Sequence, residues 1–89
     1  MHKHEELLEQ EITTTLPWYV VLFNDDFHTF DDVIIQLVKA TGCSMGRAER
    51  LAWEVHTTGR ARVFDGDFEH CLRVCNVLRE ISLQSEVQG

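Results

Sequence analysis

WYVVLFNDD, residues 18–26, is the stretch of this 89-residue chain that decides the fold. Its first six residues are aromatic, aliphatic or β-branched, which is typical of β-strands. Because the apolar run is short and unbroken, it predicts a fully buried strand, and we expect this strand at the centre of the sheet. Asn24, Asp25 and Asp26 end it, since short polar side chains hydrogen-bond to their own backbone in turns.

Two helices are predicted between this turn and Gly59. Thr29 followed by Asp32 has the arrangement of a capping box, and Gly42 can adopt the left-handed conformation that ends a helix. Ser44 is the expected N-cap of the second helix. Apolar residues at three- and four-residue steps predict the inward faces. These residues are Phe30, Val33, Ile34, Leu37 and Val38 in the first helix, and Met45, Ala48, Leu51, Ala52 and Val55 in the second.

The rest of the chain predicts a strand over residues 60–64, a turn at Asp65 and Gly66, and a third helix capped by Asp67. Weak alternation over residues 83–87 indicates a last strand. The order β-α-α-β-α-β predicts an α+β fold of two layers, a three-stranded, largely antiparallel sheet covered by three helices. We expect this domain over residues 17–89, after a flexible N-terminal arm at residues 1–16. The inward residues expected in the third helix are Phe68, Cys71, Leu72, Cys75 and Leu78.

Charge and composition exclude several classes of partner. Fifteen acidic residues against eight Lys and Arg give a net charge of −7, which disfavours binding to nucleic acid and to anionic membranes. No apolar run approaches the length of a membrane span, and residues 1–16 contain no basic region followed by an apolar stretch, so we expect no secretory signal. Three cysteines without a CxxC pair predict free thiols and a cytoplasmic protein.

Local signatures of catalysis or metal binding are absent from the sequence. It contains no phosphate-binding GxxxxGKS/T loop, no GxGxxG, no GxSxG and no HExxH, so we do not expect an enzyme or a cofactor. His70, Cys71 and Cys75 lie close together, but both thiols fall on the apolar stripe of the third helix and favour core packing over a metal site. The acidic residues after the first strand have turn and capping roles as their simplest interpretation; they are Asp25, Asp26, Asp31 and Asp32.

A resemblance to a known family is carried by three motifs at a defined spacing. NDD at residues 24–26 follows an aliphatic strand, AWEVH occupies residues 52–56, and GRA occupies residues 59–61. With Ala48, these motifs resemble the ClpS family of adaptors for Clp proteases over residues 19–87. The resemblance implies an adaptor that binds proteins bearing a large hydrophobic N-terminal residue, an N-degron. Such an adaptor delivers them to a Clp AAA+ unfoldase of the ClpA or ClpC type.

The resemblance also implies a binding site, and the chemistry of the residues agrees with it. A free α-ammonium carries three N–H donors, and an amide, a carboxylate and an imidazole can accept from it; Asn24, Asp25 and His56 supply these groups. Asp26 and His28 are possible rim residues. By family position the apolar pocket is lined by Leu22, Phe30, Val33, Ala52, Val55 and Leu83. Each of these six has a core-only alternative, which is about equally favoured for Leu22, Val33 and Leu83.

Some positions depart from the family pattern. His28-Thr29-Phe30 stands where relatives usually have Thr-Pro-Met, and Ala52 takes a place often held by methionine. We therefore keep Phe, Tyr, Trp and Leu as candidate first residues of a substrate without ranking them. Glu69 matches a position used for docking the unfoldase, but Val74 stands where a basic companion is expected.

The expected protein is a monomer of the bacterial cytoplasm or an organelle stroma. The alternative is a ClpS-like module that docks an ordinary protein surface or inhibits a protease, with a vestigial pocket. Catalysis is the least favoured of the three interpretations, because no nucleophile is placed between His56 and Asp25.

Overall fold

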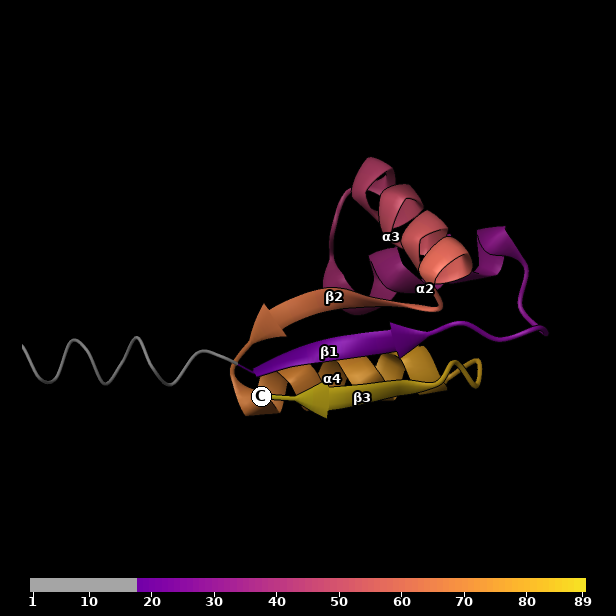
Figure 1. Cartoon of the computed structure of the whole chain (residues 1–89). Helices are drawn as coiled ribbons and strands as arrows, with labels where there is room; N and C mark the ends of the chain where they lie inside the picture. Colours follow the sequence, from indigo (N-terminus) through magenta and orange to yellow (C-terminus); the bar gives the residue numbers. More distant parts are fainter. Residues whose placement is uncertain (1–17) are drawn as a thin grey trace, which may run out of the picture.

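The computed structural model describes residues 18–89 (Figure 1). Its elements follow the predicted order β-α-α-β-α-β, which confirms the α+β fold class. The expected arm at residues 1–16 lies outside the described residues. The elements are β1 (Trp18–Phe23), α2 (Phe30–Thr41), α3 (Met45–Thr58), β2 (Arg60–Gly66), α4 (Phe68–Arg79) and β3 (Ser85–Gln88).

The sheet has three antiparallel strands in the order β2-β1-β3, so β1 is the central strand as predicted. Leu22 pairs with Ala61 of β2 and with Ser85 of β3. The turn predicted at Asp65 and Gly66 is wrong, because both residues continue β2 and pair with the first two residues of β1. Their turn-forming tendency is overridden by the ladder of β1, which is long enough to pair with them.

The N-caps and C-caps of α2 and α3 are the residues expected from the sequence. The Thr29 hydroxyl accepts from the backbone N–H of Asp32 at 3.1 Å, and the Asp32 carboxylate accepts from the backbone N–H of Thr29 at 3.3 Å. Ser44 caps α3 in the same way, through the N–H of Arg47. Gly42 and Gly59 end the two helices with φ of +73° and +95°, a region that side chains with a Cβ rarely adopt.

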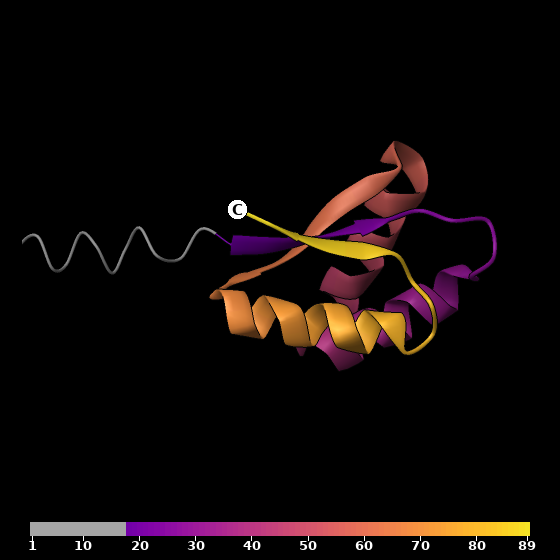
Figure 2. The same cartoon turned by 90° about the horizontal axis from the view of Figure 1, so that it is seen from below.

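The helices share one apolar core with the sheet. Helix α4 runs along β1 and β3, as Figure 2 shows, while α2 packs on α3 and α4, and α3 packs on β2. The inward residues of α4 are Cys71, Val74, Cys75 and Leu78, all buried. Val74 was missed, and the inward predictions for four residues are wrong, because Phe30, Met45, Phe68 and Leu72 are 38%, 59%, 44% and 40% exposed.

The two errors in α4 have one physical reason. Positions 71, 74, 75 and 78 already form a complete i, i+3, i+4, i+7 stripe, so Phe68 and Leu72 fall at its edge. Phe68 packs instead against the ring of Trp18, with centroids 4.8 Å apart. No helix within residues 18–89 is long and apolar enough to cross a membrane.

Candidate functional site

A cavity of about 460 Å³ opens where the end of β1, the start of α2 and the second half of α3 meet. Its floor is apolar: Ala52 and Val55 of α3 are each 3% exposed, and Val33 of α2 is half-buried. Its rim is polar and aromatic, with exposed Asn24, Asp26, Thr29, Phe30, Trp53 and His56. An apolar hole with a few convergent polar groups is the usual form of a small-ligand site.

A backbone hydrogen bond brings the two halves of the rim together. The N–H of Asn24 donates to the carbonyl oxygen of Gly59 at 2.9 Å, which joins the turn after β1 to the residue that ends α3. His56 lies in the last turn of α3, so this contact holds it beside the turn. Within residues 18–89, no hydrogen bond engages the side chain of Asn24 or of His56. Both side chains are therefore available to a ligand.

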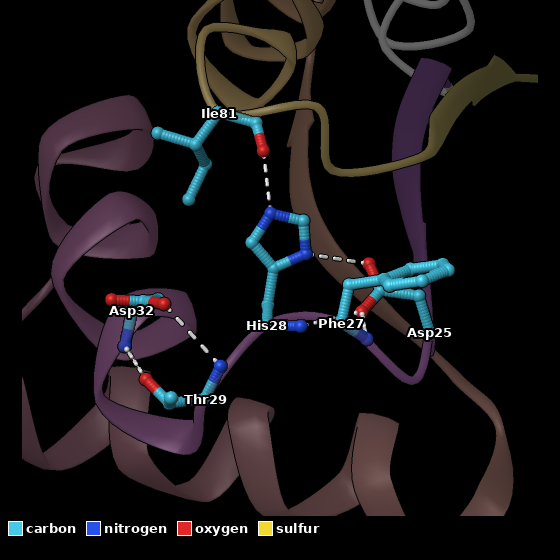
Figure 3. Close-up of polar contacts among 6 residues, drawn as sticks. All are labelled: Asp25, Phe27, His28, Thr29, Asp32 and Ile81. Carbon is cyan, nitrogen blue, oxygen red and sulfur yellow. Dashed lines mark hydrogen bonds and ion pairs between the residues drawn. The ribbon is translucent and has the colours of Figure 1, made fainter.

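Asp25 has a different role, because its carboxylate organises the turn (Figure 3). Oδ1 accepts from the backbone N–H groups of Phe27 and His28, each at 2.9 Å. Oδ2 accepts from Nδ1 of the His28 ring at 2.7 Å. The side chain of Asp25 is 19% exposed. The three residues expected to bind an amine do line one cavity. One of them, Asp25, already accepts hydrogen bonds from residues of its own loop.

His28 connects this turn to a distant segment. Its Nε2 donates to the carbonyl oxygen of Ile81, between α4 and β3 (Figure 3). A carbonyl and a carboxylate can only accept, so a ring that donates to both carries two protons and a positive charge. The hydrogen bond to Asp25, followed by that to Ile81, raises the pKa of His28 above its usual 6.5.

Burial alone would raise the pKa of Asp25, but the backbone N–H groups of His28 and Phe27 and the His28 ring outweigh it. The pKa of this carboxyl therefore lies below its usual 3.8. The site thus contains a formed ion pair, Asp25 with His28, before any ligand binds. Asp26 is exposed and makes no ion pair among the described residues, so its charge is the one left uncompensated at the rim.

Four of the six predicted pocket residues line the cavity: Phe30, Val33, Ala52 and Val55. Leu22 and Leu83 do not line it and belong to the buried core, where the core-only alternative had placed them. The possible rim residues Asp26 and His28 both line the cavity. Trp53 was missed, although it stands three residues before His56 and therefore on the same side of the helix.

Glu69 lies elsewhere, exposed in the first turn of α4 and away from the cavity lining. Val74, at the place of the expected basic companion, is 4% exposed and belongs to the core. Arg73 beside it is exposed. Among residues 18–89, no three His, Cys, Asp or Glu side chains are grouped so that they could hold a metal ion.

Comparisons with known proteins find one matching family model and relatives of two kinds, a ClpS adapter protein and ubiquitin ligases. The family model described as ATP-dependent Clp protease adaptor protein ClpS matches residues 13–88. The ClpS adapter protein of Aromatoleum aromaticum is 45% identical over 58 residues, which are 62% of this chain and 57% of that protein. The human E3 ubiquitin-protein ligase UBR2 is 37% identical over 82 residues, which are 91% of this chain but only 4% of the ligase.

A solved structure has the same fold. Agrobacterium tumefaciens ClpS2 bound to L-phenylalaninamide superposes with a TM-score of 0.73 and 17% sequence identity. The superposition covers 83% of this chain and 99% of that one. At this identity the likeness concerns the arrangement of helices and strands.

Proposed function

The chain belongs to the ClpS family of ATP-dependent Clp protease adaptors, and we propose that it binds proteins by a large hydrophobic N-terminal residue. The bound protein is then delivered to a Clp AAA+ unfoldase of the ClpA or ClpC type for degradation. One observation carries the proposal: Asn24, Asp25 and His56 surround an apolar cavity that has room for a side chain. The protein acts by binding and not as an enzyme, and it needs no cofactor.

The chemistry of a free N-terminus fits this arrangement. The amide oxygen of Asn24 and a ring nitrogen of His56 accept two N–H donors of the α-ammonium, since neither side chain has another partner among the described residues. Asp25 contributes through the remaining lone pair of Oδ2, because Oδ1 already accepts two backbone N–H groups and His28 holds the carboxylate in place. An acetylated N-terminus has lost both the charge and two of the donors, so it does not bind.

The affinity expected from this site is modest and sufficient for an adaptor. Burying a Leu or Phe side chain contributes about 1.5–3 kcal/mol, and each charge-assisted hydrogen bond contributes about the same. One buried side chain with two or three such bonds gives about −8 kcal/mol, which is micromolar binding. Phe, Tyr, Trp and Leu are the first residues that we propose, and Ala is too small to fill the cavity.

Direct binding measurements test the proposal. Fluorescent peptides that differ only in a first residue of Phe, Leu, Ala or acetyl-Phe are titrated by fluorescence anisotropy. We expect Phe or Leu to bind and acetyl-Phe and Ala to fail. Asn24→Ala and His56→Ala abolish binding while the thermal transition is retained, and His70→Ala, an exposed histidine on α4, serves as the matched control.

Two results would change the assignment. Equal binding of Phe and acetyl-Phe peptides would favour the alternative, a protein-interaction or protease-inhibiting module with a vestigial pocket. Loss of folding in both site variants would return Asn24 and His56 to structural roles.

Delivery to the unfoldase is a separate step with its own surface. We assign docking to the exposed Glu69 on α4, with Arg73 one turn later in place of the missing basic companion. Residues 1–16 then act in the transfer of substrate. We place the protein in the bacterial cytoplasm or an organelle stroma, as a monomer. Glu69→Ala keeps peptide binding and slows Clp-dependent degradation of a Phe-initiated reporter; unchanged degradation would reject this surface.

A further inference from the structure

Trp53 is a large aromatic residue on the cavity rim to which the proposed function assigns no task. Its side chain is 58% exposed, whereas Ala52 and Val55, which form part of the floor of the same cavity, are each 3% exposed. It does not form the floor that would receive the first side chain of a substrate. An exposed indole beside a binding cavity offers a ligand a large apolar surface at little entropic cost.

The indole of Trp53 is held in position by its neighbours. The ring of Phe30 packs edge-on against it, with centroids 5.8 Å apart and an interplanar angle of 81°. The ring of His56 also lies 5.8 Å away between centroids, tilted by 37°. A ring packed against two others is pre-organised, so a ligand that packs on it does not have to order it first.

The path of a bound peptide places its second residue next to this ring. The inference rests on the proposed function, in which His56 accepts from the α-ammonium and the first side chain enters the cavity. Successive Cα atoms are about 3.8 Å apart, so the second residue emerges a few ångströms from the amine. Trp53 offers a large apolar surface on the rim, with its ring centroid 5.8 Å from that of His56.

We propose that Trp53 is a specificity-determining residue that reads the second residue of the substrate, with large apolar side chains preferred over glycine. A leucine side chain laid on the indole loses only part of its contact with water. We expect a peptide beginning Phe-Leu to bind about fivefold more tightly than one beginning Phe-Gly. The alternative role, a wall for the first side chain, predicts equal effects on both peptides.

The test is a double-mutant cycle between Trp53 and the second residue of the peptide. Phe-Leu and Phe-Gly peptides, otherwise identical, are titrated against the natural protein, Trp53→Ala, Trp53→Phe and Trp18→Phe. We expect the fivefold ratio to fall to about one in Trp53→Ala and to be partly restored in Trp53→Phe. Trp18→Phe is the matched control, because Trp18 is also an exposed indole but lies at the far end of β1.

A second readout does not depend on the stability of Trp53→Ala. The chain has two tryptophans, so Trp18→Phe leaves Trp53 as the only indole emitter. We expect Phe-Leu to shift the emission of Trp53 to shorter wavelength more than Phe-Gly does. Equal emission shifts for the two peptides at saturation would overturn the role of Trp53.

The outcomes separate this inference from the proposed function. If both peptides bind and the acetylated one does not, but the Leu-to-Gly ratio is the same in the natural protein and Trp53→Ala, the second-residue role is rejected and the adaptor function stands. If no free-amine peptide binds at all, the proposed function fails and the inference fails with it.

Discussion

Replacing His28 by alanine removes the only side-chain hydrogen bond that, among residues 18–89, joins the turn after β1 to the segment between α4 and β3. The side chain is 16% exposed, and it makes one charge-assisted hydrogen bond and one to a carbonyl oxygen. Because water can replace part of these contacts, we expect the lower end of the usual range, a loss of about 1.5 kcal/mol in the free energy of unfolding. For a domain of this size that lowers Tm by roughly 6–12 °C.

The effect of His28→Ala depends on pH in a direction that the structure determines. The charged groups facing the ring are Asp25 from the turn and Asp32 from α2, and both raise the pKa of His28, as does the Ile81 carbonyl. The stabilisation is fully present below the unfolded-state value of 6.5 and is lost as pH rises through the higher folded-state pKa. The lowered pKa of Asp25 has the opposite sense: its contribution is present above 3.8 and is lost as pH falls through the folded-state value.

Thermal unfolding of the natural protein and of His28→Ala is therefore compared at pH 5.5 and pH 9. We expect the difference in Tm to be larger at pH 5.5 and to shrink as the pH rises to 9 and the ring loses its second proton, because a neutral imidazole donates to only one partner. His70→Ala is the control, since His70 is exposed and its contact to Asp67 stays within one helix turn. A Tm difference that is the same at both pH values, or larger at pH 9, would refute the doubly protonated bridge.

Three further predictions concern the frame of the site. In the native state we expect only one thiol, that of the half-buried Cys43, to react rapidly with Ellman's reagent. Cys71 and Cys75 are buried, and burial raises the pKa of Cys71, so both react slowly. Rapid reaction of all three thiols without denaturant would contradict the described core. Gly59→Ala lowers the free energy of unfolding by about 1–2 kcal/mol in urea unfolding, since φ is +95° there, and an unchanged midpoint would argue against that conformation. Thr29→Ala costs about 1 kcal/mol through loss of the capping box, and Thr29→Ser restores most of it; equal midpoints for the natural protein and Thr29→Ala would dismiss the cap.

Much of the fold could be predicted from local sequence. The apolar run of β1, the caps at Thr29, Ser44 and Asp67, and the glycines that end α2 and α3 all depend on residues within one turn of each other. The mistakes lie at the edges of this pattern. Periodicity identifies which side of α4 is apolar but not how wide the buried stripe is, so Phe68 and Leu72 were placed in the core.

The site could be predicted in part. The chemistry of Asn24, Asp25 and His56 is readable from residue type once the turn and the helix end are expected to meet, and four of the six pocket residues do line the cavity. Leu22 and Leu83 could not be separated from the core by sequence. Whether an apolar side chain faces a cavity or solid packing depends on which residue stands opposite it, and that residue is remote in the chain.

Sequence alone therefore determined the kinds of elements, their order, their ends and the chemical groups available at the first turn. Tertiary structure alone decided that Asn24 meets Gly59, that His28 reaches Ile81 and draws the Asp25 carboxylate into an ion pair, and that Trp53 stays exposed beside Phe30. The physical reason is one of range. Capping and periodicity act between residues a few positions apart, whereas these contacts join segments that only the packing of α2, α3 and α4 on the sheet brings together.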